Sequence, residues 1–133
     1  MLDLLGGQVL LLFASPGTSV PHLQTGKIKA LGVTSPTRIA ALPDVPTVAE
    51  QGLKSYEAVN WFGLVGPAAM PVEIVTKINA ALNAGLALAG VQDGIRRLGY
   101  TPAACTPQQF AERIKLDLAK WGAIIRERKI TLE

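Results

Sequence analysis

A hydroxyl-rich loop, ASPGTS at residues 14–19, is the part of the sequence best suited to binding chemistry. It follows an apolar run and leads into a short predicted helix, and backbone N–H groups at a helix N-terminus attract anions. Ser15, Thr18 and Ser19 add hydroxyl groups, and Gly17 lets a ligand approach the backbone. The loop therefore suits a carboxylate. On these residues alone, an ordinary helix cap explains the loop equally well.

The sequence contains no pattern of residues that would perform catalysis. The motifs GxSxG, GxGxxG and HExxH and the phosphate-binding Walker loop are all absent. With one histidine, His22, and one cysteine, Cys105, the chain cannot build a metal cluster or an internal disulfide. We interpret His22 as a hydrogen-bonded structural residue and Cys105 as a small, half-buried residue before a helix. No catalytic residue, cofactor or metal site is predicted, and an enzyme is the least favoured class.

The composition is that of one folded domain. Of the 133 residues, 49% are hydrophobic and 17% are charged, which excludes a disordered chain. The net charge of +3 is small and the basic residues alternate with acids, so no nucleic-acid partner is expected. The apolar opening lacks a basic start, is interrupted by Gly6 and Gly7, and is too short to span a bilayer. These residues predict no signal peptide.

The elements that would position the loop follow an α/β pattern. Residues 1–7 read as the end of a helix, and the apolar run 8–14 reads as a strand covered on both faces. A short helix ending at Gly26 leads to a second strand at 27–35, and a third strand lies around 60–65. Strand, short helix and strand in succession favour a parallel crossover and hence an α/β domain.

Four further helices are predicted from caps and apolar spacing. Thr47 and Glu50 form a capping box for a helix of one or two turns that Gly52 ends, and Thr106 with Gln109 forms a second box. Between them lie helices predicted over 71–90 and 91–99. Apolar residues at helical spacing predict two core-facing stripes, Ile74, Ile78, Leu82 and Leu86 on the first of these and Phe110, Ile114, Leu118, Trp121 and Ile125 on the last helix.

Several of these segments together resemble the substrate-binding receptors of tripartite tricarboxylate transporters, the Bug-type or TctC-like proteins. The carrying segments are GQVLLLFAS, GKIKALGVTS, WFGLVGPAAMP and TPQQF, and the most specific is LPDVPTVAEQG at residues 42–52. The resemblance runs from Leu2 to the end of the chain and covers about the C-terminal half of a typical member. It implies part of a type II periplasmic-binding-protein fold, with one lobe and part of the second built on a mixed sheet flanked by helices.

By this resemblance the chain is one α/β region with three parts. Residues 1–40 belong to lobe 2, residues 41–56 carry the PDVPT signature that braces the hinge region, and residues 57–133 return to lobe 1 and the C-terminal helices. The implied function is an extracytoplasmic, periplasmic receptor that binds a small carboxylate or related metabolite and delivers it to the integral-membrane subunits of the transporter. The implied ligand residues are Ala14, Ser15, Gly17, Thr18 and Ser19.

The chain departs from the family pattern at three positions. Ala14 stands where the family often has aspartate, Leu10 replaces a common acid, and Met70 cannot cap the next helix as threonine would. The Ala14 replacement and the half-length of the chain favour an alternative function, whereas the intact signature favours an origin as a receptor. Half of the binding cleft is also missing, which would expose apolar inner faces, so self-association is expected. The alternative function is therefore a truncated receptor paralogue that acts only as a structural or oligomerising domain and binds no ligand.

Overall fold

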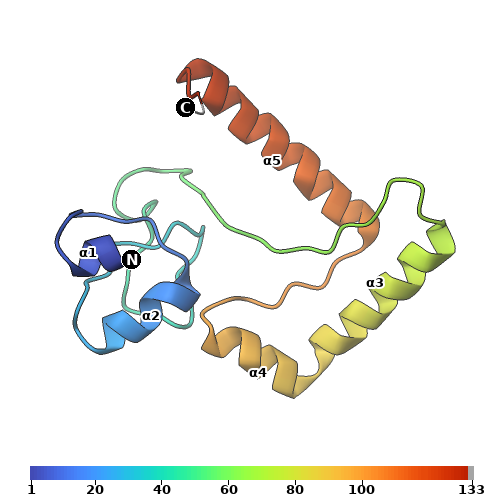
Figure 1. Cartoon of the computed structure of the whole chain (residues 1–133), viewed down its shortest axis with the longest axis horizontal. Helices are drawn as coiled ribbons and strands as arrows, with labels where there is room; N and C mark the ends of the chain where they lie inside the picture. Colours follow the sequence, from blue (N-terminus) through green and yellow to red (C-terminus); the bar gives the residue numbers. More distant parts are fainter. Residues whose placement is uncertain (132–133) are drawn as a thin grey trace. The chain divides into compact units, whose positions relative to one another are not determined.

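The computed structural model describes residues 1–131 and contains five helices. They are α1 (Leu2–Leu5), α2 (Pro16–Gln24), α3 (Val72–Ala87), α4 (Ala89–Arg97) and α5 (Pro107–Glu127), labelled in Figure 1. The chain divides into two compact units. The first holds residues 1–62 together with 88–102, and the second holds residues 63–87 together with 103 onwards. No single described helix is long and apolar enough to cross a membrane.

The helix boundaries agree with the local signals in the sequence. Thr106 accepts a hydrogen bond from the backbone of Gln109 at 3.1 Å, and the Gln109 side chain accepts one from Thr106 N at 2.9 Å, which confirms the capping box at the start of α5. Gly26 and Gly99 follow α2 and α4 with φ of 69° and 79°, a conformation that favours glycine. These ends depend only on neighbours three or four residues away.

Two predicted helices differ from the observed ones. The helix predicted over 71–90 ends at Ala87, because Leu88 is extended with ψ of 127° and caps α4 instead. The short helix predicted after Thr47 is a hydrogen-bonded turn. Its capping box is nevertheless formed, since Thr47 N donates to Glu50 Oε2 at 2.6 Å and Glu50 N donates to Thr47 Oγ1 at 3.0 Å. The helical turn ends at Gly52, whose φ of 115° lies outside the helical region.

The predicted mixed sheet does not form among the described residues. The segments predicted as strands, at 8–14, 27–35 and 60–65, are non-helical, and the one β contact is an isolated parallel bridge between Val33 and Thr47. A strand is stable when neighbouring strands accept and donate its backbone hydrogen bonds. Within the described part of the chain, residues 10–14 and 62–66 have no such neighbour.

Backbone hydrogen bonds and a capping box hold the signature segment, residues 42–52, in place within the first unit. Val33 N donates to Pro46 O at 3.0 Å, Val48 N donates to Val33 O at 2.9 Å, and Ala58 N donates to Thr34 O at 2.9 Å. Thr47, at the centre, is 2% exposed and is the one fully buried side chain among the described residues. The prolines and the capping box thus hold residues 42–52 against the segment around Val33.

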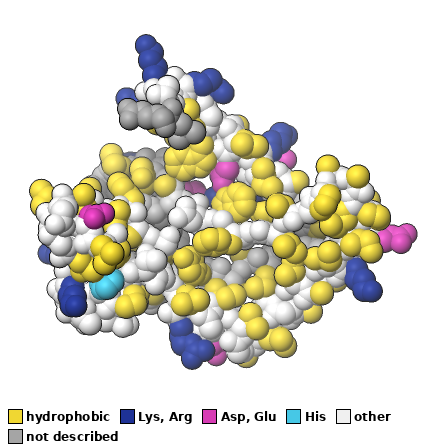
Figure 2. Space-filling model, viewed as in Figure 1, with side chains coloured by type: hydrophobic (Ala, Val, Ile, Leu, Met, Phe, Trp, Pro, Cys, Tyr) yellow, Lys and Arg dark blue, Asp and Glu magenta, His cyan; other side chains and the backbone are white. Residues whose placement is uncertain are grey.

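No apolar side chain in the described part of the chain is buried. On α5, Leu118, Trp121 and Ile125 are exposed and only Phe110 and Ile114 are half-buried, so the predicted core-facing stripe has no cover. The stripe on α3 is likewise mostly exposed. Figure 2 shows hydrophobic side chains over much of the visible face. The helices have the amphipathic pattern of a core, but the layer that would complete that core is not among these residues.

In the second unit a polar contact joins α3 to the start of α5. The amide nitrogens of Asn79 and Asn83 donate to the carbonyl oxygen of Cys105 at 2.9 Å and 3.1 Å. Cys105 is half-buried and directly precedes the cap of α5, as predicted. Nearby, Gly63 lies against the ring of Phe110, and a side chain at position 63 would collide with it.

Candidate ligand-binding site

The predicted ligand residues lie together at the start of α2, but their hydroxyl groups point back to the helix. Ser15 caps α2 with extended backbone, and Pro16 takes the first helical position. Thr18 Oγ1 donates to Ser15 O at 2.9 Å, and Ser19 Oγ donates to the same oxygen at 3.1 Å. A carboxylate only accepts hydrogen bonds, so both hydroxyl hydrogens would have to rotate away from Ser15 O to bind one.

The first turn of α2 has one backbone donor to offer. Pro16 has no N–H group, and the N–H groups of Thr18 and Ser19 both donate to Ser15 O, at 3.1 Å and 3.3 Å. The Gly17 N–H makes no backbone hydrogen bond to another described residue. Gly17 is therefore the N–H that an anion would meet at this helix end.

Gly17 also has a packing role that the sequence did not reveal. A methyl group at this position would lie 3.3 Å from Tyr100 Cε2 and 3.4 Å from Leu98 O. The absence of a side chain thus lets α2 approach the turn that follows α4. Ala14 precedes the cap and is exposed, and its methyl group can neither donate nor accept a hydrogen bond.

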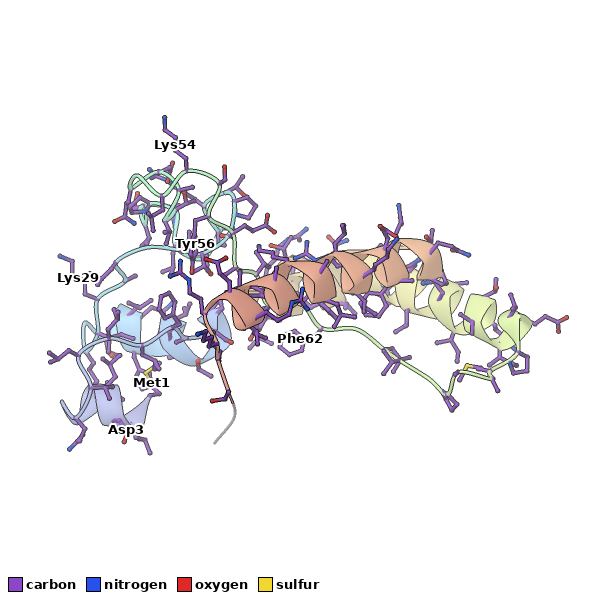
Figure 3. All side chains as sticks on the ribbon, turned by 90° about the horizontal axis from the view of Figure 1, so that it is seen from above. Met1, Asp3, Lys29, Lys54, Tyr56 and Phe62 are labelled. Atoms are coloured by element: carbon purple, nitrogen blue, oxygen red, sulfur yellow. The ribbon has the colours of Figure 1, made fainter. Side chains whose placement is uncertain are left out.

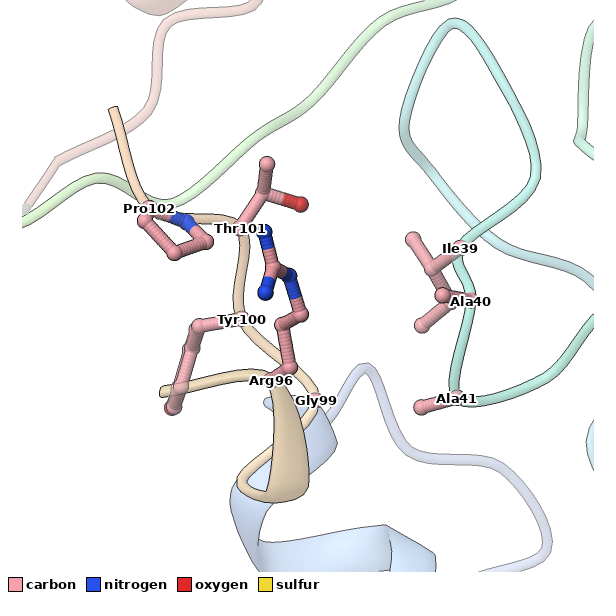
Figure 4. A pocket seen from close by; sticks show the side chains of 8 residues that line it. All are labelled: Ile39, Ala40, Ala41, Arg96, Gly99, Tyr100, Thr101 and Pro102. Carbon is pink, nitrogen blue, oxygen red and sulfur yellow. The ribbon is translucent and has the colours of Figure 1, made fainter. Parts of the chain in front are cut away.

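The same turn lines a cavity of about 190 Å³ in the first unit. Figure 4 shows the guanidinium group of Arg96 extending toward Thr101, with Ile39 and Ala40 on the opposite wall. The lining residues are Ile39, Ala40, Ala41, Arg96, Gly99, Tyr100, Thr101 and Pro102. Because residues 39–41 and 96–102 are far apart in the sequence, no local pattern predicts this cavity. The one sequence feature that falls in its lining is the basic end of α4 followed by Gly99.

Arg96 supplies the positive charge of the cavity and is partly neutralised on its own helix. Its Nη2 donates to Gln92 Oε1 at 2.8 Å, and its Nη1 lies 3.4 Å from Asp93 Oδ1. Asp93 is exposed, and Gln92 is half-buried and uncharged, so together they hold the guanidinium group only weakly. The cavity therefore combines one cation with mostly apolar walls.

Arg38 and Glu50 form an ion pair in the first unit, and Glu50 belongs to the signature segment. Arg38 Nε lies 3.0 Å from Glu50 Oε2, and Arg38 Nη1 donates to Pro43 O at 3.3 Å. The hydrogen bond from the Thr47 backbone and the one from the Arg38 side chain lower the pKa of Glu50 from its usual value. This carboxylate holds the signature turn closed, which is a structural role.

The described residues contain no group of three or more histidine, cysteine or acidic side chains placed to hold a metal ion. His22 is half-buried in α2, and its ring makes no hydrogen bond to another described residue, so the hydrogen-bonded role predicted for it is not seen. The arrangement at α2 and the Arg96 cavity suits binding of a small anion.

The comparison with known proteins decides the family. Residues 1–130 match the family described as tripartite tricarboxylate transporter family receptor. The chain belongs to this receptor family. It is 30% identical to the protein BugT of Bordetella pertussis over 127 residues, which cover 96% of this chain and 39% of BugT. The resemblance proposed from the LPDVPTVAEQG segment is thus confirmed.

Two solved structures have the same fold over this length. The R. palustris protein Rpa4515 with adipate matches with a TM-score of 0.84 and 32% identity, covering 93% of this chain and 42% of that one. The periplasmic binding protein BugD matches with a TM-score of 0.86 and 31% identity, covering 100% of this chain and 45% of BugD. The periplasmic-binding-protein fold is therefore confirmed, and the chain spans less than half the length of these two proteins.

The matching family is described as that of the receptors of tripartite tricarboxylate transporters. One structural neighbour, BugD, is a periplasmic binding protein. This supports a binding role rather than an enzymatic one for the family.

Proposed function

We propose that this chain contributes to an extracytoplasmic receptor that binds a small carboxylate and delivers it to the integral-membrane subunits of a tripartite tricarboxylate transporter. The family match over residues 1–130 carries the proposal. A structural neighbour is named as a complex with adipate, a dicarboxylate, which supports the ligand class. By the same family reasoning we place the receptor in the periplasm.

The carboxylate would bind at residues 14–19, at the N-terminus of α2. The free N–H of Gly17 and the positive end of the helix attract the anion, and the hydroxyl groups of Thr18 and Ser19 reach it once they rotate away from Ser15 O. Arg96 adds positive charge within the same unit. Its cavity adjoins this helix end, because Tyr100 both lines the cavity and packs against Gly17. Ala14 has no side-chain acceptor, so a donor group of the ligand at this exposed position would rely on the backbone carbonyl oxygen or on water.

A second candidate is a structural domain of the receptor family that oligomerises and binds no ligand. Two observations favour it: the hydroxyl donors of Thr18 and Ser19 are already used within α2, and the apolar stripes on α3 and α5 are uncovered. Such exposed apolar surface promotes association. The chain by itself would then self-associate.

A thermal-shift screen of the chain with adipate and other mono-, di- and tricarboxylates separates the two candidates. A ligand at about a hundred times its Kd adds roughly 2.7 kcal/mol of stability. Thr18→Val should abolish the shift, because it removes a hydroxyl at the proposed site. Thr25→Val is the matched control: its hydroxyl also donates to a carbonyl of α2, that of His22, at the other end of the helix.

A shift that survives Thr18→Val would contradict the proposed site. No shift with any carboxylate, together with a cooperative melt, would favour the oligomerising domain.

A further inference from the structure

The cavity beside Arg96 lies entirely within the first unit and is large enough to hold a small ligand of its own. Its volume is about 190 Å³. An engineered apolar cavity of about 150 Å³ binds benzene, so a hydrocarbon body of that size fits here. The apolar part of the lining consists of Ile39, Ala40, Ala41 and Pro102, and no lining residue is acidic.

Arg96 is the one cation in the lining, and its guanidinium group has donors to spare. A guanidinium group carries five N–H donors, of which Nη2 uses one on Gln92 and Nη1 uses one on Asp93. Three donors remain, and a carboxylate needs two of them side by side. Lys29 and Lys54 of the same unit extend outward in Figure 3, and neither lines the cavity. Arg96 can therefore bind a carboxylate and keep both of its partners.

The surroundings of Arg96 favour an anion at one side of the cavity. The C-terminal carbonyl oxygens of α4 at Ile95 and Arg96 already accept backbone hydrogen bonds from the turn that follows, so they are not free to repel it. Figure 4 shows the guanidinium group extending toward Thr101, which adds a hydroxyl donor, while Ile39 and Ala40 form the opposite wall. Charge and hydrocarbon thus lie on facing walls.

A shared wall separates the cavity from the first turn of α2. Gly99 and Tyr100 line the cavity and also pack against that turn. A methyl group on Gly99 would lie 2.5 Å from Pro16 Cβ, and one on Gly17 would lie 3.3 Å from Tyr100 Cε2. Since these contacts fill the space between them, a ligand in the cavity is held apart from one at the Gly17 N–H.

We propose that this cavity is a second anion site, which binds a small monocarboxylate with an apolar body. Arg96 and Thr101 bind the carboxylate, and Ile39, Ala40 and Pro102 contact the body. A second carboxylate on the ligand would meet the apolar wall without a counter-charge, so the site selects monocarboxylates over di- and tricarboxylates. Binding here does not require the carboxylate site proposed at residues 14–19.

The test is an NMR titration of the chain with benzoate, followed at the backbone amides of Ala41 and Thr101. We expect saturable shifts, and binding of the uncharged analogue benzamide should be about tenfold weaker or less. Arg96→Gln removes the cation and should weaken benzoate binding about tenfold or more. Arg97→Gln is the matched control, because it removes the same charge from the next residue of α4, which does not line the cavity.

A second variant tests the cavity rather than the charge. Ala40 is exposed, so Ala40→Leu is compatible with the fold, and its larger side chain narrows the cavity while Arg96 stays in place. It should weaken benzoate binding about fivefold or more. Thr18→Val alters the site at α2 and should leave the benzoate titration at Ala41 and Thr101 unchanged, so the two sites succeed or fail separately.

Saturable shifts that Arg96→Gln and Ala40→Leu weaken and Arg97→Gln preserves support the proposal. No saturable shift at millimolar benzoate, or an equal loss in Arg96→Gln and Arg97→Gln, overturns it. Binding that is indifferent to Ala40→Leu would be attraction to an exposed arginine, and binding that Thr18→Val abolishes would lie at α2. Either of these results also overturns it.

Discussion

The signature segment and two apolar segments, residues 10–14 and 62–66, differ in the backbone partners that they have. Thr47 is buried and hydrogen-bonded to Glu50, three residues on, and the segment is tied to Leu31 and Arg38 across separations of 20 and 12 residues. Leu10 and Phe62 are exposed and make no backbone hydrogen bond to another described residue, although the Phe62 ring contacts Tyr100. The signature segment has its partners within the described residues, whereas the backbone of residues 10–14 and 62–66 has none there.

Removing the hydroxyl group of Thr47 should have the largest effect on this contrast. Thr47→Val keeps the side-chain shape but deprives the Glu50 N–H of its acceptor at a 2% exposed position. The loss of a cap of this kind costs about 1–2 kcal/mol, so hydrogen exchange of the Glu50 amide should accelerate roughly 5- to 30-fold.

Thr47→Ser retains the hydroxyl group and is the control. If Thr47→Val and Thr47→Ser exchange at the same rate, the capping box does not hold the signature turn.

Acid should open the signature turn by a smaller amount. The folded pKa of Glu50 is lowered below the usual 4.5, first by the Thr47 backbone hydrogen bond and then by Arg38. The stabilisation from this carboxylate is therefore fully present above about pH 4.5 and is lost as the pH falls through the lowered pKa. Exchange of the Thr47 amide, corrected for its intrinsic pH dependence, should accelerate on acidification.

Glu50→Gln should remove this pH dependence, because glutamine can complete the capping box without titrating. A pH response that persists in Glu50→Gln would assign the titration to another group.

The smallest effect is expected in the apolar segments of the isolated chain. Leu10 is 95% exposed, so Leu10→Ser removes no packing and should change the free energy of unfolding by less than about 0.5 kcal/mol. Urea unfolding of the chain alone measures this. A destabilisation well above 1 kcal/mol would show that Leu10 is buried in the isolated chain, and the contrast with Thr47 would fail.

The sequence predicts the local features well and the long-range features poorly. The capping boxes at Thr47 and Thr106 and the glycine stops at Gly26 and Gly99 depend on residues three or four positions apart, so their patterns are visible in the chain. The strands predicted at 8–14 and 60–65 depend on distant partners, and they form no β-sheet among the described residues. Periodicity alone cannot tell a covered strand from an uncovered one.

The candidate site shows the same division. The position of residues 14–19 at the start of a helix was predictable from the proline, glycine and hydroxyl residues there. The inward hydrogen bonds of Thr18 and Ser19, the packing of Gly17 on Tyr100 and the Arg96 cavity were not, because each depends on three-dimensional placement. The ligand-binding role of residues 14–19 stays a prediction.

Residue-resolved hydrogen exchange of the isolated chain tests the central contrast most directly. We expect the amides of Val33, Val48 and Ala58 to be protected, because each donates to a backbone carbonyl of another segment. The amides of residues 10–14 and 62–66 should exchange at rates near those of an unfolded peptide. Equal protection of both sets in the isolated chain would mean that the apolar segments find their partners within this sequence, and would contradict the account.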